Sequence, residues 1–273
     1  MTAFEPLPQP LSGPRIMRQD WNDISFVHWA VDPGLVAPLL PPLTRPDVLD
    51  GMTYVGLIPF DMQRAGFGRG PAVPFLGGFA ETNVRLYSVD AEGRHGVVFR
   101  SLETSRLLVA LGARAAFATP YTWARMRILR EPGRITYVTR RRWPSPRGAG
   151  GTLRIAIGEP IAEPSPVEEF VTARFGLHTR WLGRTLWIPN HHEPWPLRRA
   201  SVERLDDTLV ASAGLPGVVG REPASVLHST GVRTAFGRPA SWGGDLLALP
   251  LTWRCTSRPS PAGAVQGSPH PGG

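Results

Sequence analysis

Short runs in which apolar and polar residues alternate recur along the chain, and this period of two is typical of strands with one buried face. We expect strands over 25–31, 52–60, 79–89, 95–102, 122–129, 135–141, 153–157, 178–181 and 185–188. Three pairs of these runs meet at short turns that contain glycine, at 90–93, 131–133 and 182–184, which predicts hairpins. The pattern therefore predicts about nine or ten strands in a mostly antiparallel sheet.

Three segments carry helix signals instead. Asp32 followed by Pro33 is a plausible start for a short helix that ends near residue 40. The segment 104–117 places leucines on one helical face, with Ser105 as a possible cap. In 165–176 we expect a helix with Ser165 and Glu168 as a capping box and Gly176 as the stop. Together with the strands, these segments predict an α+β fold: a curved or closed sheet with two or three short helices packed on one side.

The 273 residues suffice for one large domain or two small ones, and between the two ends we find neither a linker nor a repeat. We expect a Pro-rich N-terminal arm over 1–17, a single domain over 18–255 and a disordered tail over 256–273. The tail reads TSRPSPAGAVQGSPHPGG and has no apolar periodicity.

The 30 basic residues are all arginines, and the chain has no lysine. This absence removes Schiff-base catalysis, covalent pyridoxal phosphate and a P-loop lysine in one step. Cys255 is the one cysteine, which excludes an internal disulfide and a cysteine-based zinc site. We expect no cofactor.

The net charge of +8 raises the question of a nucleic-acid partner, but the arginines are scattered. Arg141 would face away from its neighbours Arg140 and Arg142 in a strand, so even this run makes no single patch. No nucleic-acid-binding motif accompanies it, and we expect a solvated basic surface instead. No apolar run approaches the ~20 residues of a membrane helix, and we expect a cytoplasmic protein without a membrane partner. The sequence leaves a homo-oligomer open.

Two other motifs resemble a phosphate-binding loop and a metal site, but their sequence context argues against both functions. The glycine-rich stretch 66–70 is followed by Pro71 rather than by a helix, so it lacks the helix N-terminus of a phosphate site. The run 191–193, His-His-Glu, lies between prolines in an extended segment, where adjacent side chains point to opposite sides. We therefore expect no metal site.

The segment 81–87 carries the best candidate site. At period two, one face of the strand holds a carboxylate, an amide, a guanidinium and a phenol, from Glu81, Asn83, Arg85 and Tyr87. These groups suit an oxygen-rich small molecule, although an ordinary strand with its polar face in water would show the same pattern. Glu81 and Arg85 lie ~13 Å apart along a strand and cannot pair directly, so each needs another partner or a ligand.

Several stretches resemble the YqjF family of uncharacterised bacterial proteins. They include "DWNDISFVHWAVDP" (20–33), "GMTYVGLIPFDM" (51–62), "GFAETNVRLYSVD" (78–90), "GVVFRSLETSR" (96–106), "ARAAFATPYTWARM" (113–126), "VEEFVTARFGLHT" (167–179) and "HEPWPLRRA" (192–200). The resemblance spans about 18–240. That family is similar in turn to the acetoacetate decarboxylase superfamily, which implies a cone-like antiparallel sheet around a small-molecule pocket.

The resemblance also implies which residues matter. Members of that superfamily attack their substrate with a lysine that follows a proline, and the matching position here is Tyr121 after Pro120. A phenol cannot form an imine, so lysine-dependent acetoacetate decarboxylation is excluded if this match holds. Glu81 matches the superfamily's strand glutamate. We therefore take Glu81 and Tyr121 as candidate catalytic residues and Asn83, Arg85 and Tyr87 as candidate ligand-binding residues.

The resulting hypothesis is a small-molecule pocket protein that acts on a small keto or hydroxy acid without Schiff-base chemistry. The alternative is a non-catalytic ligand-binding or regulatory module that uses the same cavity. The sequence does not decide between the two.

Overall fold

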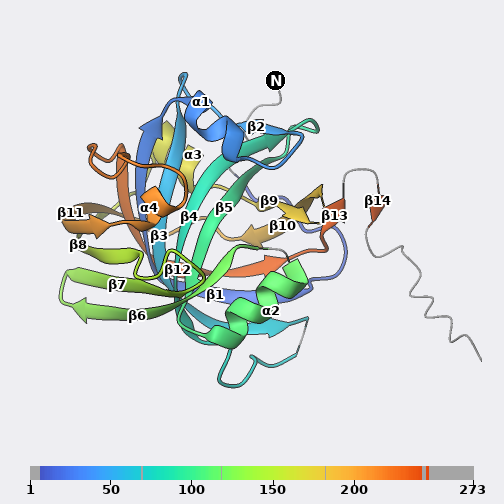
Figure 1. The fold of residues 1–273 in the computed structure, drawn as a ribbon, viewed down its shortest axis with the longest axis horizontal. Helices are drawn as coiled ribbons and strands as arrows, with labels where there is room; N and C mark the ends of the chain where they lie inside the picture. The colour runs from blue at the N-terminus through green and yellow to red at the C-terminus, as the bar shows by residue number, and fades with distance from the viewer. Residues whose placement is uncertain (1–6, 69, 118, 182, 242–243, 246–273) are drawn as a thin grey trace, which may run out of the picture.

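One large, curved sheet makes up most of the molecule. The structure, a computed structural model, describes residues 7–68, 70–117, 119–181, 183–241 and 244–245. In this part of the chain, fourteen strands follow the order β14-β13-β10-β9-β5-β6-β7-β8-β11-β12-β1-β3-β4-β2, with β10–β12 and β5–β4 as further pairings. The pairings of β5 with β6 and with β9 are parallel and the others are antiparallel. The expected α+β fold with a curved, mostly antiparallel sheet is confirmed (Figure 1).

Five long strands form a wall in the middle of the molecule: β1 (Met17–Val31), β3 (Thr53–Phe67), β4 (Phe79–Asp90), β5 (His95–Thr104) and β12 (Ser225–Phe236). On one side the wall is closed by β9 (Gly176–Trp181) and β10 (Arg184–His192), so that seven strands form a ring. On the other side it is closed by β6 (Tyr121–Glu131), β7 (Arg134–Trp143), β8 (Gly150–Pro160) and β11 (Leu197–Asp207). Short edge strands are β2 (Thr44–Pro46), β13 (Ala240–Ser241) and β14 (Gly244–Asp245). We call the two enclosures the seven-strand ring and the nine-strand ring.

Because the wall is shared, both of its faces are buried. On β4, alternation sends Val84 and Leu86 into the apolar core of the nine-strand ring, with Leu57 and Ile155. On the opposite face of the wall, Ile58, Phe60 and other apolar residues form a second core inside the seven-strand ring. Every residue from 81 to 90 is buried as a result, so the polar face of β4 does not lie in water.

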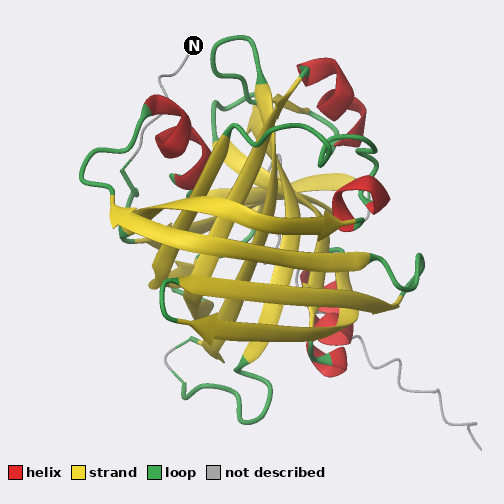
Figure 2. Cartoon of the chain, turned by 90° about the vertical axis from the view of Figure 1, so that its left-hand side faces the viewer, coloured by secondary structure: helices red, strands yellow, loops and turns green. Residues whose placement is uncertain are grey.

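The helices lie at several places around the sheet (Figure 2), so the expectation that they pack on one side is wrong. They are α1 (Pro33–Val36), which continues as the 3-10 turn η1 (Ala37–Leu39), α2 (Leu107–Phe117), α3 (Pro166–Thr172) and α4 (Leu209–Ser212). The Asp32 cap is confirmed, since its side chain accepts a hydrogen bond from the Gly34 N–H. The capping box of Ser165 and Glu168 is also confirmed. None of the described helices has the length and apolar content that crossing a membrane requires.

Two helix boundaries differ from expectation. The helix α2 begins at residue 107 rather than 104, because β5 continues to Thr104 and the Ser105 hydroxyl accepts from the Ala80 N–H instead of capping. Helix α3 ends at Thr172, and Gly176 begins strand β9 instead of stopping the helix. The Trp187 ring lies directly over Gly176, where a Cβ would collide with it. Strand β1 begins at Met17, and both the expected boundary at 255 and the expected tail 256–273 lie outside the described residues.

Candidate functional site

The seven-strand ring encloses a cavity of about 390 Å³. Its lining comes from all of the ring's strands, from α2 and from the start of β6. Exposed or half-exposed lining residues lie on α2, at the end of β3 and on the segment after it, among them Leu108 and Phe67, each 63% exposed. The cavity therefore opens between α2 and the β3–β4 connection, and a volume of this size is typical of small-molecule sites.

Glu81 lies near this opening, two residues into β4, and is 3% exposed. Tyr121 is the first residue of β6, and its parallel pairing with Leu102 of β5 brings its side chain over the cavity. The Tyr121 hydroxyl donates to Glu81 Oε2 at 2.9 Å. Burial raises the pKa of Glu81 to about 8, although the Tyr121 hydrogen bond opposes the rise, and Glu103 adds to it through its charge. Glu81 is therefore a neutral acid at pH 7.

Arg85 lines the same cavity four residues further along β4, away from the β3–β4 connection, and is 8% exposed. Its Nε donates to the Tyr87 hydroxyl at 2.9 Å, and its Nη2 donates to the Val171 carbonyl at 2.6 Å. Its partner on β3 is Gly56, where a Cβ would lie only 3.2 Å from Arg85 Cγ. Among the described residues no carboxylate lies within ion-pair distance of Arg85. A buried guanidinium without a counter-charge is costly, which makes this group a ready anion site.

The neighbourhood of Arg85 supplies no anion. The second buried cation nearby, Arg174, is paired with Asp47. Burial, together with the positive charges of Arg85 and Arg174, lowers the pKa of His28 well below its ordinary value. Burial lowers the pKa of His192 to about 4, and Arg85 again contributes. Both imidazoles are neutral at pH 7 and add no charge beside Arg85, and no carboxylate of the described residues lies within ion-pair distance to balance the Arg85 charge.

Two carboxamide side chains of the lining each have an oxygen atom without a hydrogen-bond partner among the described residues. Asn83 and Asn190 are 4% and 6% exposed, and within the described part of the chain the Oδ1 atom of each has no hydrogen-bond partner. Most buried polar atoms in proteins are hydrogen-bonded, so each such atom calls for an explanation. Each of these oxygen atoms can accept a hydrogen bond from a donor inside the cavity.

The structure thus places four of the five candidate residues, Glu81, Asn83, Arg85 and Tyr121, in one cavity. Tyr87 is fully buried and does not line it, because its hydroxyl lies among His28 Nε2, Arg85 Nε and the Val171 carbonyl. The Tyr87 hydroxyl accepts the hydrogen bond from Arg85 Nε and so fixes the position of the guanidinium. Sequence reasoning missed Asn190, although extending the strand predicted at 185–188 by two residues would have placed it on the same face as Ile188.

The arginine run at 140–142 and the histidine pair at 191–192 lie outside this set of candidate residues. Arg141 is buried and its neighbours Arg140 and Arg142 are exposed, as period two predicts. His191 and His192 differ in burial, and the described residues hold no cluster of three or more groups that could bind a metal.

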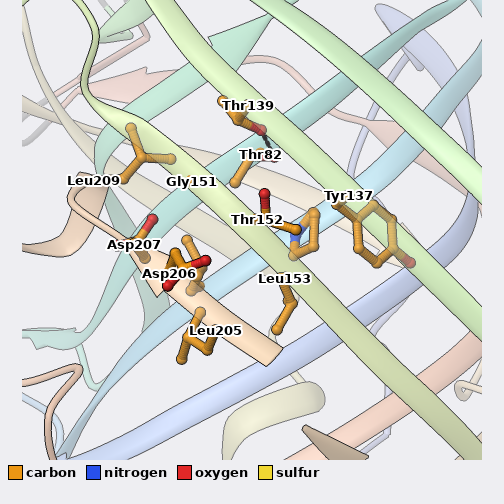
Figure 3. A pocket seen from close by; sticks show the side chains of 12 residues that line it. Thr82, Tyr137, Thr139, Gly151, Thr152, Leu153, Leu205, Asp206, Asp207 and Leu209 are labelled. Carbon is orange, nitrogen blue, oxygen red and sulfur yellow. Dashed lines mark hydrogen bonds between the residues drawn. The ribbon is translucent and has the colours of Figure 1, made fainter. Parts of the chain in front are cut away.

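The nine-strand ring also holds a buried acid and a small pocket. Its buried acid, Glu103, is bound by Arg141, Thr122 and Ser101, so its hydrogen bonds are internal. A second pocket, between β4, β7, β8 and β11, has a volume of about 20 Å³, and a Thr82–Thr139 hydrogen bond crosses its edge (Figure 3). That space is enough for about one water molecule.

Comparison with known proteins agrees with this architecture. Uncharacterized protein YqjF of Bacillus subtilis (strain 168) is 30% identical over 200 residues, which are 73% of this chain and 82% of YqjF. The enduracididine biosynthesis enzyme MppR, solved in complex with pyruvate, is similar in structure with a TM-score of 0.57 at 13% identity, over 84% of this chain and 91% of MppR. Acetoacetate decarboxylase from Legionella pneumophila subsp. pneumophila str. Philadelphia 1 gives a TM-score of 0.57 at 15% identity, over 89% of this chain and 94% of that chain.

These structural likenesses show that the fold is that of the acetoacetate decarboxylases. The family model named DUF2071, described as "Uncharacterized conserved protein (COG2071)", matches residues 18–233. This chain therefore belongs to the DUF2071 family, as a YqjF-like protein.

Proposed function

We propose that the cavity of the seven-strand ring binds an organic acid and that Glu81 exchanges a proton with it. Arg85 binds the carboxylate of the ligand, with Asn83 beside it, and Tyr87 positions Arg85. The observation that carries the proposal is a neutral buried acid and an unpaired buried cation in one cavity. The MppR–pyruvate complex supports the ligand class, since a protein of similar fold binds an organic acid.

The chemistry differs from that of an imine-forming enzyme, because the chain has no lysine to attack a carbonyl carbon. Glu81 instead acts as a general acid: its carboxyl hydrogen moves to the carbonyl oxygen of the bound ligand while a solvent water molecule takes a hydrogen from the adjacent carbon, which gives the enol. The carboxylate that remains keeps the hydrogen bond from the Tyr121 hydroxyl, which stabilises it until a proton returns. Burial raises the pKa of Tyr121 well above its ordinary value, so Tyr121 stays a donor throughout.

Two measurements test this function. A thermal-shift screen of keto and hydroxy acids should find ligands that raise the melting temperature of the protein. For each ligand found, proton NMR in D2O should then show exchange of the hydrogens next to its carbonyl group.

We expect Glu81→Gln to bind the ligand and to lose the exchange, whereas Glu131→Gln, an exposed control at the end of β6, keeps both. Activity that depends on the neutral acid should fall as the pH rises through about 8. Binding without exchange in the unaltered protein would contradict proton transfer and would favour a non-catalytic binding module.

A further inference from the structure

We propose that the ligand is an elongated, mostly apolar monocarboxylic acid, and not a three- or four-carbon acid. Its carboxylate binds Arg85 at the closed end of the cavity, and its chain runs past Glu81 and Tyr121 to the opening near α2. This inference rests on the proposed function and specifies its ligand.

The first argument is the separation of the two polar ends. Glu81 and Arg85 are four residues apart on one strand, so their Cα atoms lie ~13 Å apart. The Arg85 guanidinium leans away from Glu81, because its Nε is bound to the hydroxyl of Tyr87, two residues further along β4. A hydrogen bond at each end takes up ~3 Å, which leaves ~7 Å or more for the ligand itself.

A ligand that contacts both Arg85 and Glu81 must therefore be longer than a three- or four-carbon acid. An extended chain advances about 3.5 Å per three bonds, so ~7 Å corresponds to about six bonds. Pyruvate and acetoacetate are too short to hold Arg85 and reach Glu81 at the same time.

The second argument is the chemistry of the lining. Of the described residues that line the cavity, Arg85 and Glu81 alone have side chains that ordinarily carry a charge at pH 7. Glu81 is neutral here because burial raises its pKa to about 8. The cavity therefore provides for one negative charge. Apart from the carboxamides of Asn83 and Asn190, most of the surrounding lining is apolar, with Ile24, Ile58, Phe60, Met62, Phe99 and Leu102. A hydrocarbon chain fits this surface, and a second charge on the ligand would meet no partner.

The third argument is the opening. Leu108 on α2 and Phe67 at the end of β3 line the cavity and are each 63% exposed. Apolar side chains left in water at the mouth of an apolar cavity mark a place where an apolar chain can continue outward. The opening therefore sets no sharp upper limit on the length of the ligand's hydrocarbon chain, and acids longer than octanoate can also bind.

Isothermal titration with butyrate, hexanoate, octanoate and decanoate tests the proposal, with pyruvate as the short keto acid. Burial of each methylene stabilises the complex enough for about a fourfold gain in affinity, so octanoate, with four more methylenes, should bind about 250-fold more tightly than butyrate. Octylamine should not bind. Arg85→Gln should lose most of the affinity for octanoate but keep that for octanol, which needs no cation and also reports that the variant is folded.

A matched pair of variants tests the path of the chain. Leu108→Asp places a charge at the opening and should weaken decanoate binding at least tenfold while leaving butyrate binding unchanged. Leu129→Asp alters a leucine that is 53% exposed on β6 and does not line the cavity, so it should change neither.

If short acids bind and the affinities for butyrate and octanoate differ less than twofold, the elongated ligand is refuted while the organic-acid site stands. If no acid of any length binds, both proposals fail. Equal loss of decanoate affinity in both leucine variants would contradict the assigned path of the chain.

Discussion

Replacing Glu81 by glutamine should make the protein more stable at alkaline pH. In the folded state the Glu81 carboxyl is buried, and its pKa is raised to about 8, whereas the ordinary value in an unfolded chain is 4.5. Between these two values the folded state holds a proton that the unfolded state has released. The free energy of unfolding therefore falls as the pH rises through this window, by ~1.4 kcal/mol per pH unit.

The magnitude follows from the same two values. The whole window corresponds to a loss of about 5 kcal/mol, of which about 4 kcal/mol falls between pH 5 and pH 9. Glutamine has nearly the same shape, cannot ionise and can still accept the hydrogen bond from Tyr121. At pH 5 the variant should match the unaltered protein to within about 1 kcal/mol, the contribution of one hydrogen bond.

Urea denaturation at several pH values measures this effect. Other groups titrate over the same range, but they do so in both proteins, so the difference between the two profiles isolates Glu81. We expect that difference to grow by about 4 kcal/mol in favour of Glu81→Gln between pH 5 and pH 9. A difference that stays constant within 1 kcal/mol over this range would show that Glu81 is not held neutral in the folded protein.

Three further predictions concern the chemistry and the packing. Borohydride in the presence of pyruvate or acetoacetate should leave no adduct on any internal residue, because the chain has no lysine; peptide mass mapping that finds one would contradict the absence of imine chemistry. Arg141→Met should lower the free energy of unfolding in urea by about 3–5 kcal/mol, because it leaves Glu103 buried without its partner, and a loss below 1 kcal/mol would contradict the buried pair. Gly176→Ala should lower the melting temperature and cost about 1–3 kcal/mol, since the new Cβ collides with the Trp187 ring; an unchanged melting temperature would show that β9 and β10 are packed less closely.

Much of the local structure follows from short-range rules. The turns at Gly93, Gly133 and Gly183 all have positive φ values, from 69° to 81°, which glycine tolerates best, and the three predicted hairpins form there. Period two correctly placed Glu81, Asn83 and Arg85 on one face of β4. These features depend on neighbours in sequence, which is why the sequence alone predicts them.

The features that make the site depend on contacts between distant segments. Strand β12 was not predicted, yet it pairs with β1 over residues 225–236 and closes both rings. Tyr121 meets Glu81 only because β6 joins β5 in parallel, and no local pattern encodes that joint. The direction of the Arg85 side chain depends on Val171, which follows it by 86 residues.

Gly176 is a residue whose local sequence pattern gave the wrong prediction, because a contact with a distant segment determines its place. Its position after a helical pattern is typical of a helix stop, but the ring of Trp187 on the neighbouring strand determines where it lies. Strand β11 was missed for a similar reason, because its sequence LRRASVERLDD is mostly polar and it is recognisable as a strand only through its pairing with β8.

The central claim is that one cavity holds the carboxylate of an elongated acid at Arg85 and its chain beside Glu81 and Tyr121. A crystal structure of the protein with octanoate tests this claim most directly. The account predicts the carboxylate oxygens within 3.2 Å of Arg85 nitrogens and the chain running between Glu81 and Leu108 towards the opening. Octanoate with its carboxylate at the opening, or bound outside the seven-strand ring, would contradict it.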